Sequence, residues 1–489
     1  MLWVQTSFYL FGLLTLAVGI GATLLVYCFY KEYFALLQDG LSLSLNSKSR
    51  CACTWIAYKN YLLYSIHLLL YGLLRICQLI SLRIAGIQSH LDRCKVGEEY
   101  ETSAQLLKVW SRSKPTFFTI LYQRHFLSTH VKFVHPEYSL QKHITLMTVT
   151  DKEAIFCVPS SKVDILNVKK WPFLFHAQHK TAEYILVMPI QSLIKLASVL
   201  GDPTAKVIWI HHTGRCGSTA MAQVCNALPN VLTISEPLNV FSLDQYFKYK
   251  HLRNGSLDWE PTEEYLKIYQ STVRVMLSKS YLKSAEIIVV KAAPANSMVD
   301  LNLIVELFPK FYQCFDIQRS STSFIASSMI LSRFFPNVKP HATLQNCCND
   351  KKHVEWLLGK SSVHNHTEFI AFVISWCEMC SHYMKLCESL THPNVPAFKY
   401  EHWQSNPDKY LETFFKLVDL ELTDERLQIV KDVLNEDSQK NSMFSREKVK
   451  QRGVEIPKDM IHVANSYSKF YHLPKWGESF TLPNTVTSP

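Results

Sequence analysis

A group of small, hydroxyl-bearing and basic residues follows a buried strand near the middle of the chain. Residues 206–210 (KVIWI) form a continuous β-branched and aromatic run, typical of a strand buried on both faces. The loop after this run, which precedes a helix-forming stretch, contains Gly214, Arg215, Cys216, Gly217, Ser218 and Thr219. Glycines let the backbone approach an anion, amides at a helix start donate to it, and an arginine adds positive charge. The segment therefore predicts an anion-binding loop, and a plain strand-to-helix turn with Ser218 as its N-cap is the alternative.

The loop does not have the pattern of a nucleoside-triphosphate P-loop. That pattern is GxxxxGK[ST], in which the lysine reaches the terminal phosphates. If Gly217 is the second glycine, the first falls on His212 and the lysine falls on Ser218. Two essential residues are absent, so a P-loop kinase or nucleotide hydrolase is a disfavoured alternative.

Further candidate residues lie at the ends of other predicted strands. We expect these strands at residues 231–235, 287–291, 311–318 and 398–401. Glu236 follows the first of them, Lys291 ends the next and Arg319 follows the third. Strands that alternate with helices predict an α/β domain with a parallel sheet, in which ligands bind outside the carboxyl ends of the strands. We therefore expect these residues to meet the loop, with Glu236 on the strand beside it.

Four motifs, in order along residues 206–422, together resemble the sulfotransferase family and are most similar to its membrane-bound carbohydrate branch. The first resembles the 5′-phosphosulfate loop, with Cys216 as its one departure. The second is Glu-Pro-Leu at 236–238, which begins 21 residues after Arg215. The third pairs Arg319 with Ser327, although 320–322 depart from the usual Asp-Pro-Arg. The fourth is Tyr-Glu at 400–401 with a proline at 407.

The resemblance implies a P-loop-like sheet and transfer of a sulfuryl group from 3′-phosphoadenosine 5′-phosphosulfate (PAPS) to a hydroxyl acceptor, with a glycan as the first expectation. It implies no metal. Glu236 is implied as the general base, with Arg215 and Lys291 as the other catalytic residues. The implied donor-binding residues are Gly214, Arg215, Cys216, Gly217, Ser218, Thr219, Arg319, Ser327 and Arg452. Because two motifs depart from the family, a catalytically inactive membrane interaction protein on the same fold is a further alternative.

Several nearby residues have two explanations. Arg452 belongs to a basic segment, 440–458, which is either a lid over the nucleotide or a solvated face. Lys291 is followed by alanines where cytosolic sulfotransferases have a Lys-Thr-His-type base motif, which favours Glu236 as base. Of His211 and His212, one is expected to pack beneath the loop. Cys377 and Cys380 are spaced as metal ligands, but no second such pair follows, so the sequence disfavours zinc.

The N-terminal part of the chain has the composition of a membrane anchor. Residues 8–30 contain no charge, and as a helix of about 34 Å they would cross a bilayer. A cleaved signal peptide is the disfavoured alternative, because the apolar stretch is long and no basic residue precedes it. A second apolar run, 61–82, predicts an interfacial helix, a stem helix or a second span. Basic residues after the first span favour a cytosolic body for one span and a lumenal body for two. Glycosylation sequons at Asn254 and Asn365 favour a lumenal body. The resemblance to membrane-bound carbohydrate sulfotransferases implies the Golgi, with the catalytic domain in its lumen.

Length and composition limit the remaining possibilities. The 489 residues are 48% hydrophobic, which excludes a disordered chain. The net charge of +10 suits an anionic ligand or membrane surface but is spread too thinly for nucleic acid. Short strands at 144–150, 154–159 and 183–189, and a helix at 191–200, predict a small β-containing layer before a break at 201–203. The expected organisation is a membrane helix at 8–30, a stem at 31–100, an accessory region at 101–202 and an α/β domain at 203–480.

Overall fold

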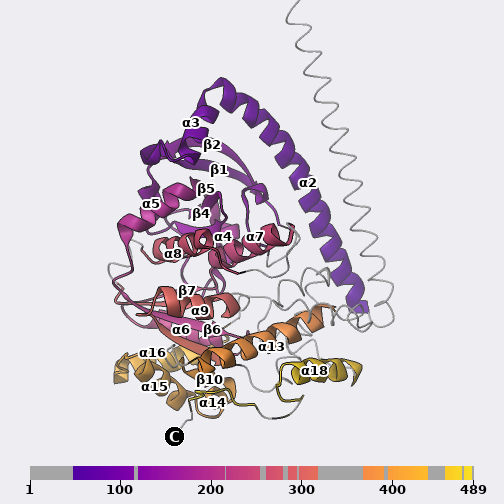
Figure 1. Ribbon diagram of the computed structural model, residues 1–489, viewed down its shortest axis with the longest axis vertical. Helices are drawn as coiled ribbons and strands as arrows, with labels where there is room; N and C mark the ends of the chain where they lie inside the picture. Colours follow the sequence, from indigo (N-terminus) through magenta and orange to yellow (C-terminus); the bar gives the residue numbers. More distant parts are fainter. Residues whose placement is uncertain are drawn as a thin grey trace, which may run out of the picture. The chain divides into compact units, whose positions relative to one another are not determined.

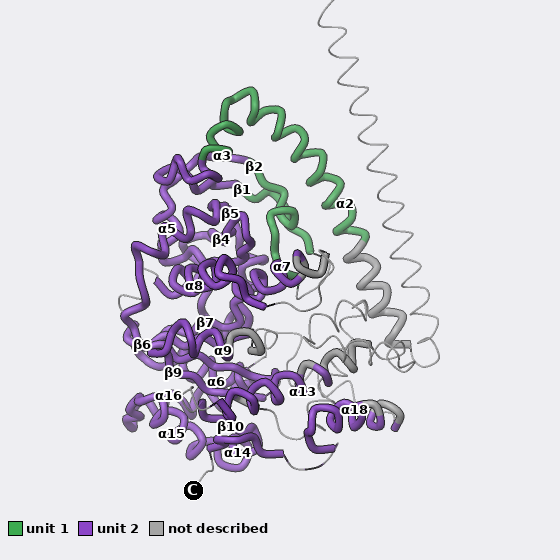
Figure 2. The backbone as a smooth tube through the Cα atoms, viewed as in Figure 1, with its two compact units in different colours: residues 1–93, 108–129 green, residues 94–107, 130–489 purple. Residues whose placement is uncertain are grey.

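The computed structural model places most of the chain in two compact units. It describes residues 48–114, 119–214, 216–253, 260–278, 285–293, 297–317, 367–389, 395–438, 458–475, 478 and 480–486. Unit 1 comprises Met1–Arg93 and Lys108–Thr129, and unit 2 comprises Cys94–Leu107 and His130–Pro489 (Figure 2). The predicted span at 8–30 lies outside the described residues, as do four predicted site residues, Arg215, Arg319, Ser327 and Arg452.

The main element of unit 1 is one long helix, α2 (Lys48–Ile84), and the predicted apolar helix at 61–82 is its second half. Its segment Leu62–Ile84 contains an 18-residue stretch with a mean hydropathy of 1.6, of which 11% is buried, so by length and composition it could cross a membrane. Among the described residues it is the one helix with these properties. The short helices that follow are α3 (Ile87–Lys95), η1 (Tyr100–Thr102), η2 (Gln123–His125) and η3 (Pro136–Leu140).

The first sheet has five strands in the order β2-β1-β5-β4-β3. Its strands are β1 (Ala104–Arg112), β2 (Phe126–Val134), β3 (Thr145–Val149), β4 (Glu153–Pro159) and β5 (Ala182–Pro189). The hairpin β3–β4, the strand β5 and the following helix α5 (Ile190–Leu200) were predicted from the sequence. Strands β1 and β2 were not, because polar residues interrupt their apolar alternation. The helix α4 (Leu174–Thr181) precedes β5.

The second sheet, in unit 2, has the order β10-β9-β6-β8-β7, and all of its neighbouring strands are parallel (Figure 1). Its strands are β6 (Lys206–His212), β7 (Val231–Ser235), β8 (Ile287–Lys291), β9 (Tyr312–Ile317) and β10 (Ala397–Lys399). The predicted α/β fold is therefore confirmed. The fifth strand is shorter than predicted, because the chain turns into a helix at Tyr400.

Helices cover both faces of this sheet. On one face, Ile208 and Ile210 pack with Met221 of α6 (Ser218–Ala227) and Phe414 of α15 (Pro407–Leu417). On the other face, Phe315 packs against helices α9 (Ser297–Leu307) and α13 (Thr367–Glu388). The remaining helices after the sheet are α14 (Tyr400–Ser405), α16 (Asp424–Leu434) and α18 (Lys458–Phe470). This two-sided burial explains why the strands are continuous apolar runs.

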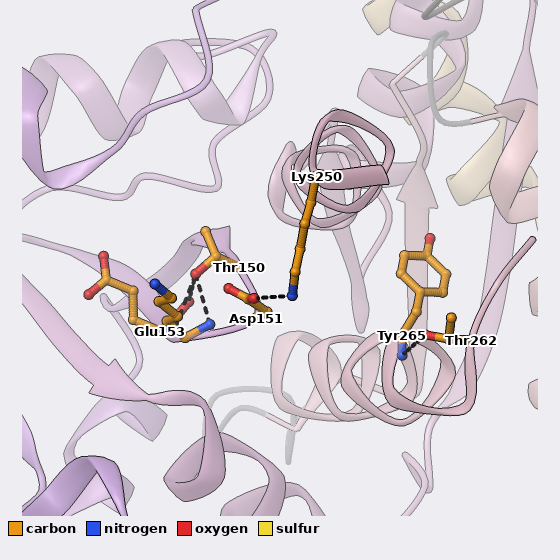
Figure 3. A network of polar contacts seen from close by, with 7 residues as sticks. Thr150, Asp151, Glu153, Lys250, Thr262 and Tyr265 are labelled. Atoms are coloured by element: carbon orange, nitrogen blue, oxygen red, sulfur yellow. Dashed lines mark hydrogen bonds and ion pairs between the residues drawn. The ribbon is translucent and has the colours of Figure 1, made fainter. Parts of the chain in front are cut away.

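Two helices, α7 (Asn239–Arg253) and α8 (Glu263–Leu277), pack against β3 of the first sheet. The Ser242 hydroxyl of α7 accepts a hydrogen bond from the Val149 amide at 2.9 Å. Lys250 of α7 forms an ion pair with Asp151 at 2.7 Å (Figure 3). Asp151 lies in the β3–β4 turn, where the Thr150 hydroxyl accepts a hydrogen bond from the amide of Glu153. Because only residues 236–238 separate β7 from α7, these contacts help to fix the segment that carries Glu236.

Candidate functional site

The predicted anion-binding loop joins β6 to α6. Gly214 and Gly217 both have positive φ, 84° and 86°, in the left-handed region that favours glycine. Gly217 is the N-cap of α6, and Ser218 is its first helical residue, so the alternative in which Ser218 caps the helix is wrong. A Cβ on Gly217 would lie 2.9 Å from two ring carbons of Tyr400. Gly217 is therefore required both by its backbone conformation and by the close approach of this ring.

The buried imidazole of His212 supports the loop from the end of β6. Its Nδ1 accepts the Gly214 amide at 3.1 Å, and its Nε2–H donates to the Ala292 carbonyl at 2.7 Å. Burial, and then the nearby charge of Lys291, hold the pKa of His212 well below its usual range. The ring is neutral, and both nitrogens are used. His212 therefore holds the loop to the segment after β8 and has no free lone pair for a proton.

His211 points to the other face of the sheet. Its Nε2–H donates to the Gln313 side-chain oxygen at 2.8 Å, and burial lowers its pKa to about 4. Its Nδ1 has no hydrogen-bond partner among the described residues. Alternation along β6 separates the two histidines, so only His212 packs with the loop.

Lys291 joins the loop to Glu236. Its ammonium donates to the Thr219 hydroxyl at 3.1 Å and forms an ion pair with Glu236 Oε1. Both partners of the ion pair are buried, with side-chain exposures of 1% and 7%. The sequence placed Glu236 on the strand beside the loop, and this was wrong, because β8 lies between β6 and β7. Lys291, at the end of β8, spans the intervening distance.

Glu236 is held by its backbone as well as by its side chain. It has φ 52°, in the left-handed region, and its amide donates to the Lys291 carbonyl at 2.8 Å. That conformation costs a non-glycine residue about 1–2 kcal/mol. Such strain persists where the surrounding structure fixes it, and it is concentrated at functional sites. The carboxylate is thus oriented by two contacts with one neighbouring residue.

Two contacts at the site involve residues that the sequence did not single out. The Lys291 ammonium lies 5.5 Å from the centroid of the Phe173 ring. The Ser235 hydroxyl donates to the Pro172 carbonyl at 2.7 Å, which fixes the end of β7 to the same segment. No motif marks this segment, so the sequence offered no signal. For Tyr400 a signal existed, since the residue belongs to the fourth motif, but its contact with Gly217 was not foreseen.

The structure places the other predicted residues as follows. Cys216, Ser218 and Thr219 are buried in the loop and the first turn of α6. Cys377 and Cys380 are buried in α13, and burial raises the pKa of both thiols. In the described part of the chain, no group of three or more His, Cys, Asp or Glu residues is arranged to hold a metal ion. Of the predicted site residues that the structure describes, it brings together Lys291, Glu236 and the loop, through the contacts of Lys291 with Thr219 and Glu236.

No protein-family model and no curated protein matches the chain. Three solved structures to which it is similar are sulfotransferases. The sulfotransferase domain of the Synechococcus PCC 7002 olefin synthase is 12% identical, with a TM-score of 0.32 over 58% of this chain and 97% of that domain. Sulfotransferase STF1 of Mycobacterium tuberculosis is 13% identical, with a TM-score of 0.33 over 50% and 75% of the two chains. Sulfotransferase STF9 of Mycobacterium avium is 11% identical, with a TM-score of 0.32 over 59% and 83%.

Proposed function

We propose that this protein transfers a sulfuryl group from PAPS to a hydroxyl acceptor. The observation that carries the proposal is the contact of Lys291 with both Thr219 and Glu236. It joins an anion-binding loop, a buried cation and a candidate base at one end of a parallel sheet. Transfer of an anionic group needs all three, because catalysis depends on positioning and on stabilising charge at the leaving oxygen.

Each group has a distinct role in the proposed reaction. The acceptor oxygen forms a bond to sulfur, and the bond from sulfur to the bridging phosphate oxygen breaks. The acceptor proton passes to Glu236. Arg215, Lys291 and the amides that follow Gly217 stabilise the negative charge on the leaving 3′-phosphoadenosine 5′-phosphate (PAP).

The donor has a second phosphate, which requires its own contacts. We assign them to Arg319, whose fork matches a phosphate, with Ser327 beside it. Arg452 would close over the nucleotide from the basic segment 440–458. The P-loop kinase alternative is weakened because no lysine stands at Ser218. The inactive-protein alternative is weakened because an ion pair and a strained Glu236 are retained.

A glycan is the acceptor class we propose, because the Glu-Pro-Leu motif resembles that of carbohydrate sulfotransferases. A membrane-attached enzyme of this kind would work in the Golgi lumen. We expect the chain expressed in animal cells to migrate faster after treatment with peptide N-glycosidase, owing to glycans at Asn254 or Asn365. Loss of that shift in the variant with both Asn254→Gln and Asn365→Gln is the control. An unmodified wild-type chain would contradict the lumenal placement.

PAP should stabilise the purified full-length chain, because a ligand that binds only the folded state raises its melting temperature by mass action. ATP, which lacks a 3′-phosphate, should raise it much less. The Arg319→Ala variant should lose most of this preference, because it lacks the guanidinium group that matches the 3′-phosphate. Differential scanning fluorimetry in detergent measures the melting temperatures of the wild type and the variant with each nucleotide. Equal shifts from PAP and ATP would favour the kinase alternative, and full discrimination by Arg319→Ala would refute the phosphate assignment.

Gly217→Ala should weaken PAP binding by about tenfold or more, which corresponds to about 1.4 kcal/mol. The new methyl group meets Tyr400 and would displace either the loop or the ring. The control is Gly201→Ala, where φ is 67° and nothing lies within 4 Å of the added Cβ. That variant should also lose stability from backbone strain but bind PAP normally. Isothermal titration calorimetry measures the affinity of each variant for PAP. Equal affinities in Gly217→Ala and Gly201→Ala would refute the role of the loop in binding PAP.

A further inference from the structure

Helix α2 of unit 1 has two different sides. Taking about 100° per residue, five of the seven exposed aliphatic residues of α2 fall within a sector of about 100°, and the other two, Ile76 and Leu79, lie about 40° and 100° beyond one edge of it. The five are Leu63, Ile66, Leu70, Ile80 and Ile84, with exposed fractions of 51%, 43%, 48%, 56% and 83%. This aliphatic face runs along more than 20 residues of the helix. Such an extended apolar surface is typical of a membrane or protein contact.

Another side of α2 is attached to protein. The His67 Nε2–H donates to the Arg124 carbonyl at 3.1 Å, and the Gln78 side-chain amide donates to the Ser128 carbonyl. The Tyr64 ring stacks on His125, with 5.5 Å between the ring centroids. The segment from Arg124 to Ser128 thus runs alongside the helix within unit 1. A helix that crossed the bilayer here would draw this segment, with its exposed Arg124, into the hydrocarbon.

The charges near α2 favour an anionic surface. Between residues 41 and 91 the chain has no acidic residue, whereas it has five basic ones: Lys48, Arg50, Lys59, Arg75 and Arg83. An excess of basic over acidic residues along an apolar helix favours the headgroups of anionic lipids. In addition, residues 31–47 are the only link between α2 and the predicted membrane span at 8–30. With that predicted span in a bilayer, the chain itself would keep α2 close to the same membrane.

We propose that α2 lies along the surface of an anionic membrane, with its aliphatic face at the boundary between headgroups and acyl chains, and does not cross the membrane. This orientation does not depend on sulfuryl transfer. It leaves residues 8–30 as the one predicted span. With one span, the basic residues that follow it favour a cytosolic body, whereas the sequons favour a lumenal body. The glycosidase experiment decides between these two topologies.

Photolabelling of the full-length chain in nanodiscs tests this orientation. The discs contain phosphatidylserine and phosphatidylcholine, with a diazirine placed either near the headgroup or at the end of the acyl chain. Mass spectrometry should find the shallow probe on the aliphatic face of α2, at helical spacing, and the deep probe on residues 8–30 alone. Deep labelling around Leu70 would show a second span, and absence of lipid labelling would show a different partner; either result would overturn the proposal.

A variant with a matched control makes the test independent of the anchor at 8–30. Ile80→Glu should reduce shallow labelling of α2 by about tenfold, because it replaces apolar surface that would contact lipid with a charge that anionic lipid repels. Val199→Glu is the control, because Val199 is also an exposed aliphatic residue, at 71%, but lies in unit 2. It should leave the labelling of α2 unchanged. Unchanged labelling in Ile80→Glu would refute a contact through this face.

Discussion

Glu236→Gln should reduce turnover by roughly 10²–10⁴, the usual effect of removing a positioned general base. The amide keeps an oxygen that accepts a hydrogen bond from Lys291, but it has no basic carboxylate to take the acceptor proton. Affinity for PAP should change little, because the amide keeps the hydrogen bond with Lys291 and no contact between Glu236 and PAP is proposed. The measurement is kcat with labelled PAPS, together with the Kd for PAP by calorimetry.

Near-normal turnover in Glu236→Gln would refute the base assignment. His212 could not replace it, because both of its ring nitrogens already form hydrogen bonds. His211 lies on the other face of the sheet, so Lys291, which loses its carboxylate partner in this variant, would become the next candidate. A substitution that abolished PAP binding together with turnover would instead show that Glu236 has a structural role.

Lys291→Met should destabilise the protein by about 3–5 kcal/mol, because it leaves a carboxylate buried without its cation. It should also abolish turnover, since the same ammonium contacts Thr219 in the loop. Chemical denaturation measures the first effect, and the PAPS assay measures the second.

The double variant Glu236→Gln with Lys291→Met separates stability from catalysis. Removing both charges should restore most of the lost stability, because no unpaired charge remains buried. It should not restore turnover. Recovery of turnover in the double variant, or normal stability in Lys291→Met, would contradict the proposed relation between this ion pair and the reaction.

The main sheet could be predicted because its strands are buried on both faces. The run 206–210 and the run 287–291 contain apolar residues almost without interruption, which is typical of parallel strands between helices. Strands β1 and β2 contain Lys, Gln, Ser and His among their apolar residues, and β1 lies beside β5, far along the chain. Their identity as strands depends on this long-range pairing, which no local pattern reveals.

The residues of the candidate site could be named from the sequence, but their arrangement could not. Gly217, Glu236 and Lys291 each follow or end a predicted strand, which placed them at one edge of the sheet. The contact between Glu236 and Lys291 depends on β8 lying between β6 and β7, and the order of strands is not given by their order in the chain. The contact of Tyr400 with Gly217 likewise depends on β10 occupying the opposite edge of the sheet.

The most direct measurement is sulfuryl transfer itself by the full-length chain in lipid nanodiscs. The protein is incubated with PAPS carrying labelled sulfate and with separate pools of glycan, lipid, steroid and tyrosine-peptide hydroxyl acceptors. We predict that label appears in the glycan pool, with one PAP released for each sulfate transferred, and that Glu236→Gln transfers almost none. A wild-type protein that binds PAP but transfers label to no hydroxyl acceptor, and releases PAP no faster than the Glu236→Gln variant, would contradict the assignment as a sulfotransferase.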